Sequence, residues 1–234
     1  MNNRILLKLS GEALAGPNKF GIDPKTVTGI AEELKEVTKD GYQIAIVVGG
    51  GNIWRGQGAA ELGMDRSQAD YMGMMATIMN GLALQDSLEA IGVSSRVQTA
   101  LHVDQVAEPY IRRRTIRHLE KDRVVILAGG TGMPYFTTDS NTMLRASELN
   151  INLVLMAKNG VDGVYDKDPN KHDDATRYET LTYKEILEKQ LKVMDLTASS
   201  LADENGLTTI VFNMNEKGNI LKVLKDNSIG TIIK

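Results

Sequence analysis

The sequence predicts an α/β fold, a three-layer α/β/α sandwich with a largely parallel central sheet. Short apolar runs rich in Val and Ile recur along the chain. They are continuous rather than alternating, which is typical of strands covered on both faces. Helical periodicity lies between most of them, so ligands should gather at the carboxyl ends of the strands. We predict strands at Ile5–Leu9, Ile44–Val48, Val93–Val97, Val124–Leu127, Leu153–Met156, Thr209–Phe212 and Thr231–Ile233.

The first helix should follow Asp23-Pro24, a capping residue with proline in the first turn, and end at Gly41. Its apolar residues, Val27, Ile30, Leu34 and Val37, share one face. No repeat, low-complexity tract or linker rich in Pro or Ser divides the 234 residues. We therefore expect a single domain over residues 1–234.

A long helix is expected from about Arg66 to Ile91. Its apolar residues are Met72, Met75, Met79, Leu82 and Leu88, with Met74, Ile78 and Leu84 widening the stripe. A helix that is apolar on most sides needs partners on more than one side. Met is an adaptable packing residue, so we favour a core helix over a hydrophobic-ligand site. A subunit interface is compatible with this interpretation.

The one basic run is Arg112-Arg113-Arg114 with Arg117 and His118. Ile111, Thr115 and Leu119 would pack on one helical face, which leaves most of the arginines in water. We therefore favour a solvated face over a nucleic-acid site. Farther along, a helix over 140–149 would follow Asp139, which could cap it.

The composition excludes several kinds of chemistry. The chain has no cysteine, which rules out disulfides and a cysteine nucleophile and fits a reducing compartment. Its three histidines are far apart, so a histidine-built metal centre is not expected. The net charge of −3 argues against a broad nucleic-acid surface, and no apolar stretch is long enough for a membrane span. We expect a cytoplasmic protein that binds neither nucleic acid nor membrane.

Glycines concentrate after four of the predicted strands. Fourteen of the 22 glycines fall within residues 8–21, 49–63, 129–132 and 160–163. Glycine permits close approach of the backbone to a ligand, and N–H groups near a helix start bind anions. Tight turns would explain any one loop, but four at one sheet edge suggest several phosphates. Neither GxxxxGK[ST] nor a GxGxxG after the first strand occurs, so the common phosphate motifs are absent.

These loops resemble the amino-acid-kinase superfamily in four motifs: Lys8-Leu9-Ser10-Gly11-Glu12-Ala13, Gly49-Gly50-Gly51-Asn52, Gly130-Thr131-Gly132 running to Phe136-Thr137-Thr138-Asp139, and Asp162-Gly163-Val164-Tyr165 before Asp168-Pro169. Further strings, among them Asn52-Ile53-Trp54-Arg55-Gly56 and Lys192-Val193-Met194-Asp195, resemble its bacterial uridylate kinases. The resemblance covers nearly the whole chain. It implies transfer of the γ-phosphate of ATP to UMP, giving UDP and ADP, in pyrimidine nucleotide biosynthesis.

The resemblance implies site residues on two sides, with the acceptor loops mainly in the N-terminal half and 129–139 and the ATP loops mainly in 157–215. The residues implied in catalysis are Lys8, Arg55, Asp139 and Asp195. Those implied for ATP are Lys8, Leu9, Ser10, Gly11, Gly51, Arg55, Asn159, Tyr165 and Asp168. Those implied for UMP are Gly50, Asp70, Thr131, Gly132, Met133, Pro134, Tyr135, Phe136, Thr137 and Thr138.

Chemistry supports these roles, and some residues have a structural alternative. Phosphoryl transfer needs positive charge and in-line positioning, which Lys8 and a bidentate Arg55 would supply. A phosphate acceptor is already ionised, so no general base is assigned. Ser67-Gln68-Ala69-Asp70 also reads as a helix capping box, and Asp168 could form an Asx turn before Pro169. Met133 replaces the asparagine of the motif, so a polar side-chain contact is not expected there.

The resemblance also implies cofactors, effectors and assembly. Mg²⁺ would be held mainly by the ATP phosphates, with no dedicated protein site, and Asp139 and Asp195 would orient it or Lys8. GTP would activate and UTP inhibit a homohexamer built from dimers, with the Met-rich helix as a dimer contact. An effector-responsive loop would span Gly16, Pro17, Asn18, Lys19, Phe20 and Gly21.

Two other functions remain open from the sequence. One is an acyl-phosphate kinase acting on carbamate or an amino acid, which Arg55, Asp70 and the Thr-Thr-Asp loop disfavour. The other is a non-catalytic nucleotide sensor. Retention of Lys8 with Asp139 and Asp195 argues for turnover instead.

Overall fold

The central sheet of the computed structural model, which describes residues 3–226 and 228–234, has the strand order β4-β3-β5-β2-β1-β6-β10-β11-β9. Neighbouring strands run parallel except β10 and β11, which confirms a largely parallel sheet. The strands are β1 (Arg4–Leu9), β2 (Gln43–Val48), β3 (Ser95–Thr99), β4 (Glu108–Pro109), β5 (Val124–Ala128), β6 (Leu153–Lys158), β9 (Thr180–Leu181), β10 (Thr208–Asn213) and β11 (Thr231–Ile233).

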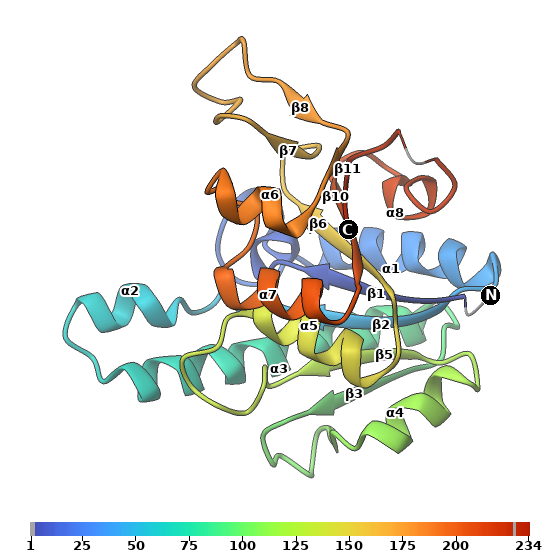
Figure 1. Cartoon of the computed structure of the whole chain (residues 1–234). Coiled ribbons are helices and arrows are strands. Elements are labelled where there is room, and N and C mark those ends of the chain that lie inside the picture. Colours follow the sequence, from blue (N-terminus) through green and yellow to red (C-terminus); the bar gives the residue numbers. More distant parts are fainter. Residues whose placement is uncertain (1–2, 227) are drawn as a thin grey trace.

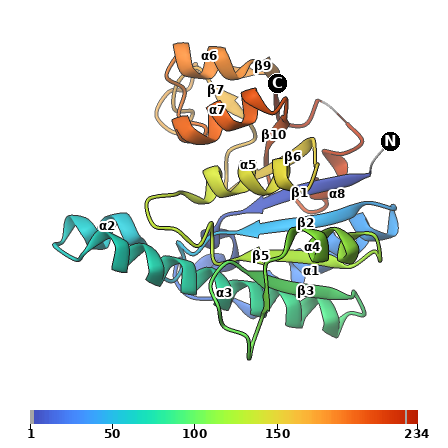
Figure 2. The ribbon, with the colours of Figure 1, turned by 60° about the horizontal axis from the view of Figure 1, so that its bottom comes forward.

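Helices cover both faces of this sheet (Figures 1 and 2). One apolar core joins Ile5 and Leu7 to α1 (Pro24–Lys39), α3 (Arg66–Ala90) and α8 (Asn219–Lys222). The other joins Leu6 to α4 (Arg112–Leu119), α5 (Thr138–Glu148), α6 (Tyr183–Glu188) and α7 (Leu196–Glu204). Successive β1 residues thus enter opposite cores, as a strand buried on both faces requires. The predicted three-layer sandwich is confirmed.

All seven predicted strands are present, with bounds that differ by up to two residues. The sequence analysis missed four two-residue strands, β4, β9, and the separate antiparallel pair β7 (Val164–Tyr165) and β8 (Arg177–Tyr178). Two residues are too few to show a hydrophobic period. The β7–β8 hairpin stands out from the sheet, above one side of its carboxyl edge (Figure 1).

The first helix is confirmed in detail. The Asp23 carboxylate caps α1 by accepting from the Thr26 N–H at 2.9 Å. Gly41, at φ 86°, follows the helix end in the left-handed conformation that glycine adopts without strain. Among the described residues, no helix is long and apolar enough to cross a membrane.

The long helix is confirmed, but only part of its apolar stripe lies in the core. Met74 and Leu88 are buried, whereas Met72, Met75 and Met79 are 43, 47 and 54% exposed. Together with α2 (Gly56–Glu61), the first half of α3 forms an arm that projects beyond the sheet (Figures 1 and 2). These three methionines are therefore left partly uncovered by the part of the chain that the structure describes.

Candidate active site

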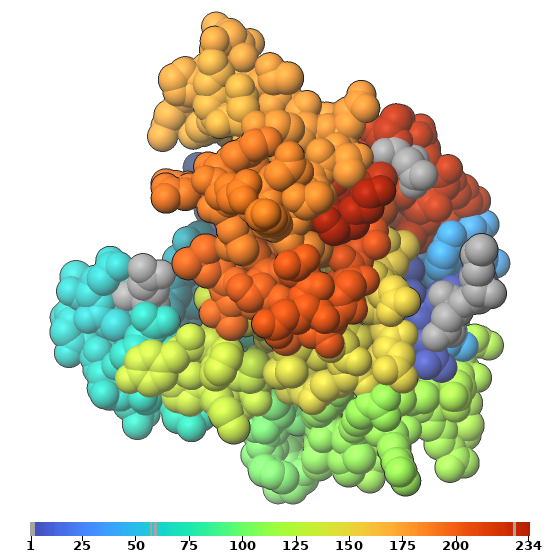
Figure 3. Space-filling view, viewed as in Figure 1, coloured from blue at the N-terminus to red at the C-terminus, as the bar shows by residue number. Residues whose placement is uncertain are grey.

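A cleft of about 710 Å³ lies at the carboxyl edge of the sheet, lined mainly by the loop after β1, by residues 157–171 and by residues 189–193. In Figure 3 the surface is indented between the arm of α2 and α3 and the part of the chain that holds α6 and the β7–β8 hairpin. Five predicted ATP-side residues line this cleft: Lys8, Ser10, Asn159, Tyr165 and Asp168. Leu9, Gly11, Gly51 and Arg55 are not among its described lining residues.

Lys8, which lines the cleft, pairs with Asp139. Lys8 is 8% exposed, and its Nζ lies 3.1 Å from Asp139 Oδ1. The alternative that Asp139 caps the following helix is wrong, because α5 begins at Thr138 and the Thr137 hydroxyl accepts from the Ser140 N–H. Asp139 Oδ1 is buried and receives no hydrogen bond in good geometry from the described residues. A buried oxygen of this kind is a candidate ligand-binding group.

Close packing of the first two loops explains Gly11. A Cβ on Gly11 would lie 2.6 Å from the Gly51 N and 2.5 Å from Asn52 Oδ1, so a side chain there would displace the second loop. Asn52 and Asn80 exchange hydrogen bonds at 2.7 and 3.0 Å, and Asn80 also donates to the Gly49 carbonyl at 2.7 Å. These contacts fix the predicted phosphate loop against α3.

Sequence reasoning missed Asn80 as a support of this loop. The residue is fully buried in α3. Its signal was an amide in the middle of an uncharged and largely apolar stretch. A buried amide must find partners, which here are the loop backbone and Asn52.

Arg55 lies beside the cleft, with its guanidinium paired to Glu12. Its side chain is 70% exposed, and that of Glu12 is 41% exposed. Because exposed ion pairs contribute little to stability, a phosphate could displace this carboxylate at small cost. The pair also links the β1 loop to the β2 loop.

Asp70 connects α3 to the predicted acceptor loop. Its carboxylate accepts from the Tyr135 N–H at 2.8 Å and pairs with Arg66 at 2.9 Å. The capping-box interpretation is wrong, because α3 begins at Arg66 and the Asp65 carboxylate accepts from the Gln68 N–H. Asp70 therefore does not cap α3, and its carboxylate contacts the acceptor loop.

The acceptor loop from Thr131 to Thr138 is open on its outer side. Met133, Tyr135 and Phe136 are 63, 67 and 51% exposed, and Tyr135 has a positive φ of 71°. The loop starts where Arg145 donates to the Gly130 carbonyl at 3.2 Å, and it ends at the Thr137 cap of α5. Such a surface can receive a second substrate next to Asp139.

Asp195 lies at the same end of α5. It caps α7 through the Ala198 N–H at 2.9 Å, and it accepts hydrogen bonds from Ser140 at 3.0 Å and from Thr137. Its described hydrogen-bond partners therefore belong to α5, its cap and α7, and Lys8 is not among them. This carboxylate holds the α5 start, and with it Asp139, against α7.

The ATP-side residues make local contacts across the cleft wall. The Tyr165 hydroxyl donates to Asp162 at 2.6 Å, and this bond raises the pKa of Tyr165. Asp168 accepts from the Asn170 N–H at 3.0 Å, which is the predicted Asx turn, and still lines the cleft. Asn159 accepts from Asn215 at 2.6 Å.

Lys158, at the end of β6, is a cleft residue that sequence reasoning missed. Its half-buried ammonium donates to the Val193 carbonyl at 2.8 Å. Burial, with the nearby Lys8 ammonium second, lowers the pKa of Lys158. No motif marked this lysine, because its position next to Lys8 depends on the register of β1 and β6.

The predicted effector loop joins the phosphate loop through one residue. The Gly21 N–H donates to the Asn52 carbonyl at 2.8 Å, and the Asn52 amide donates back to the Gly21 carbonyl at 2.7 Å. Lys19 has a positive φ of 60°, and Phe20 is 72% exposed. A change in this loop would therefore reach Asn52 directly.

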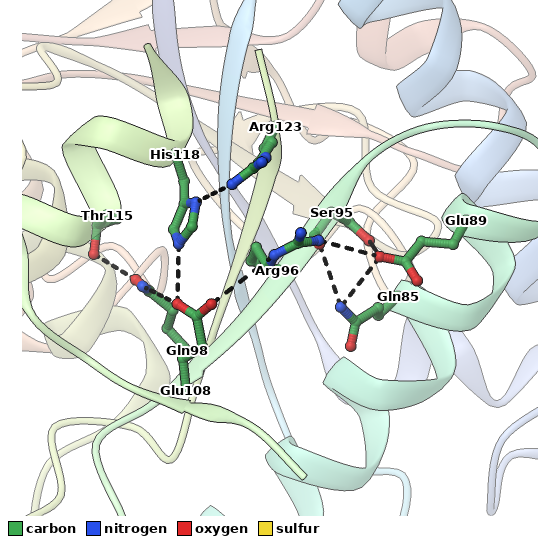
Figure 4. Close-up of polar contacts among 9 residues, drawn as sticks. All are labelled: Gln85, Glu89, Ser95, Arg96, Gln98, Glu108, Thr115, His118 and Arg123. Carbon is green, nitrogen blue, oxygen red and sulfur yellow. Dashed lines mark hydrogen bonds and ion pairs between the residues drawn. The ribbon is translucent and has the colours of Figure 1, made fainter. Parts of the chain in front are cut away.

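The basic run is a solvated face, as predicted. Arg112, Arg113, Arg114 and Arg117 are exposed on α4, while Thr115 and Leu119 are buried. Ile111 departs from the expectation, because it precedes the helix and is 47% exposed. His118 is buried and contacts Glu108 at 2.9 Å, away from the cleft lining (Figure 4).

Comparisons with known proteins agree with this geometry. Residues 3–213 match the model of the amino acid kinase family. The chain is 62% identical to a uridylate kinase of Limosilactobacillus reuteri (strain DSM 20016) over 99% of this chain and 96% of that protein. It is 43% identical to a UMP kinase of Ureaplasma parvum, with a TM-score of 0.94 over 100% and 99% of the two chains. It is 40% identical to a UMP kinase of Bacillus anthracis, with a TM-score of 0.95 over 99% of this chain and 96% of that one. The chain therefore belongs to the amino acid kinase family, and within it to the uridylate kinases.

Proposed function

We propose that this uridylate kinase transfers the γ-phosphate of ATP to UMP, giving UDP and ADP, at the Lys8–Asp139 pair. The observation that carries the proposal is the position of this pair. Lys8 lines the cleft, while Asp139 directly follows the acceptor loop that Asp70 contacts through Tyr135. The γ-phosphate of an ATP bound in the cleft would therefore lie between ATP and a UMP bound at the acceptor loop.

The chain's own residues supply positive charge and orientation. Catalysis of phosphoryl transfer depends on positioning and on electrostatic stabilisation of the migrating group. The Lys8 ammonium contacts that group, and the Gly50 and Gly51 backbone donors hold a neighbouring phosphate. Arg55 leaves Glu12 to form a bidentate contact with phosphate oxygens. Asp195 keeps the start of α5 in place.

Mg²⁺ fits this arrangement as a partner of ATP. Among the described residues, no group of three or more His, Cys, Asp or Glu side chains could hold a metal ion alone. Mg²⁺ typically combines one or two carboxylates with phosphate oxygens, and Asp139 Oδ1 is a buried carboxylate oxygen without a hydrogen bond in good geometry. Bound there, the ion would neutralise charge on the phosphates.

An acceptor panel tests the proposed function. ADP release from Mg-ATP is measured with UMP, CMP, dUMP, carbamate and glutamate in parallel. We expect UMP to give the highest kcat/KM. A preference for carbamate or glutamate would favour an acyl-phosphate kinase, and ATP binding without acceptor-dependent release would favour a nucleotide sensor.

We also propose the homohexamer built from dimers that the resemblance implies. The exposed stripe of Met72, Met75 and Met79 supports a subunit contact within it, because exposed apolar patches commonly mark interfaces. Light scattering tests this, since Met75→Glu should release smaller species if the stripe is a subunit contact. An unchanged molar mass would show that the stripe is not a subunit contact.

We further propose that GTP activates and UTP inhibits the enzyme, and that the protein is cytoplasmic. The two effectors can be tested by adding each of them to the same ADP-release assay.

A further inference from the structure

Lys158 lies near Lys8 in the sheet, although no motif marks it. In the parallel pairing of β1 with β6, Lys8 lies opposite Met156. Side chains two residues apart on a strand point to the same face of the sheet. Lys158 therefore lies on the same face as Lys8, on the neighbouring strand and two residues closer to the carboxyl edge. Both lysines line the cleft.

The Lys158 ammonium is incompletely paired. A lysine carries three N–H donors, and among the described residues one acceptor is found, the Val193 carbonyl at 2.8 Å. No carboxylate of a described residue lies within ion-pair distance of its Nζ. Asp139 and Glu12 act on it only at longer range.

Two ammonium groups held close together repel each other, and the Asp139 carboxylate is paired with Lys8 rather than with Lys158. Burial and the Lys8 charge both lower the pKa of Lys158, in that order. A polyphosphate is the kind of ligand that removes this cost, because its oxygens accept from both lysines and carry the opposite charge. A neutral or singly charged ligand would not satisfy both groups.

We propose that Lys158 binds the β- and γ-phosphates of the nucleotide in the cleft, as a second phosphate-binding lysine beside Lys8. Its bond to the Val193 carbonyl orients the side chain and connects it to the residues that precede Asp195. This role rests on the proposed function, since it assigns the cleft to ATP. It makes selectivity for di- and triphosphates over monophosphates a property of this lysine pair.

Binding measurements with ligands of increasing charge test the proposal. Dissociation constants for ATP, ADP, AMP and adenosine are measured by titration calorimetry without added metal, for the wild type, Lys158→Met and Lys158→Arg. We expect Lys158→Met to weaken ATP and ADP about 10- to 100-fold, the range of a lost charge-assisted hydrogen bond. Its affinities for AMP and adenosine should stay unchanged, and Lys158→Arg should recover part of the loss.

Lys35→Met is the matched control. Lys35 is also half-buried, and its Nζ donates to the Ile91 carbonyl at 2.7 Å, outside the cleft lining. This control should lose a comparable lysine–carbonyl bond without losing ATP affinity. Equal losses for all four ligands in Lys158→Met, or no loss for ATP, would overturn the proposal and leave Lys158 a structural support.

The same data separate this inference from the proposed function. A wild type that binds ATP with the expected Lys158 dependence, but releases no ADP with UMP, would contradict only the acceptor assignment. A wild type active with UMP, whose ATP affinity does not depend on Lys158, would contradict only the role of this lysine.

Discussion

Two polar clusters of this protein differ in how completely their groups are paired. In the Lys8 cluster, formed by Lys8, Asp139 and Lys158, two ammonium groups act on each other, and Asp139 Oδ1 has no hydrogen bond in good geometry. In the Glu108 cluster, formed by Gln98, Glu108, Thr115, His118 and Arg123, each side chain has a partner (Figure 4).

The hydrogen-bond partners in the Glu108 cluster determine which ring nitrogen of His118 carries the proton. The Arg123 guanidinium can only donate, so it donates to His118 Nδ1 at 3.0 Å, and His118 Nε2 donates to Glu108 at 2.9 Å. The difference between the clusters indicates their roles. Polar networks whose groups are all hydrogen-bonded hold elements together, whereas incompletely paired groups at a cleft are candidates for binding a ligand.

The largest expected effect is on turnover, from Lys8→Met. Loss of a group that stabilises charge in the transition state should lower kcat about 100- to 1,000-fold. Folding stability should change little, because the substitution removes both the attraction to Asp139 and the repulsion of Lys158. Steady-state kinetics and denaturant unfolding measure the two effects. Retained turnover would show that Lys8 does not contact the migrating phosphate.

Asn80→Ala sharpens the comparison, because this residue belongs to a satisfied network that supports the site. It should lower the free energy of unfolding by about 2–3 kcal/mol, since the Gly49 carbonyl and the Asn52 side chain lose buried partners. ATP binding should weaken as well, as the phosphate loop loses its support. Asn80→Asp is the matched variant.

Asn80→Asp keeps the side-chain shape but cannot donate to the Gly49 carbonyl, so its loss of stability should be at least as large. Urea unfolding followed by circular dichroism measures both variants. A smaller loss for the aspartate than for the alanine would mean that Asn80 acts by filling space rather than by hydrogen bonding.

Much of the fold could be predicted from the sequence, because strands such as β1 and helices such as α1 carry their signals locally. Continuous apolar runs and the Asp23-Pro24 cap lie within a few residues of the structure they specify. The exposed side of α3 could not be predicted, since a Met stripe looks alike whether this chain or a second one covers it.

The site was predictable where a motif marked it and not where chain packing created it. Lys8 was identified from its loop, but Lys158 lies beside it only because Lys8 pairs with Met156 in the sheet. The two capping errors share one cause. Asp65 and Thr137 stand a few residues before Asp70 and Asp139, and backbone conformation, which sequence does not show, decides which side chain caps.

The smallest expected effect is a pH dependence in the Glu108 cluster. Burial raises the pKa of Glu108, but hydrogen bonds from Gln98 and His118, with the charge of Arg114, outweigh it, so the net pKa lies below its ordinary 4.5. A carboxyl whose pKa is lower in the folded protein stabilises it fully above that ordinary value. The contribution is lost as the pH falls through the folded pKa.

Glu108→Gln tests this contribution, because it keeps an acceptor oxygen and removes the charge. At pH 7 the variant should be less stable by about 0.5–1 kcal/mol, a small value because Glu108 is partly exposed. Urea unfolding of both proteins from pH 7 to pH 3 should show this difference shrinking below about pH 4.5, the ordinary pKa of the carboxyl. ADP release with UMP at pH 7 should be equal in the two proteins. A fall in activity without a fall in stability would place the Glu108 cluster with the Lys8 cluster as a functional site.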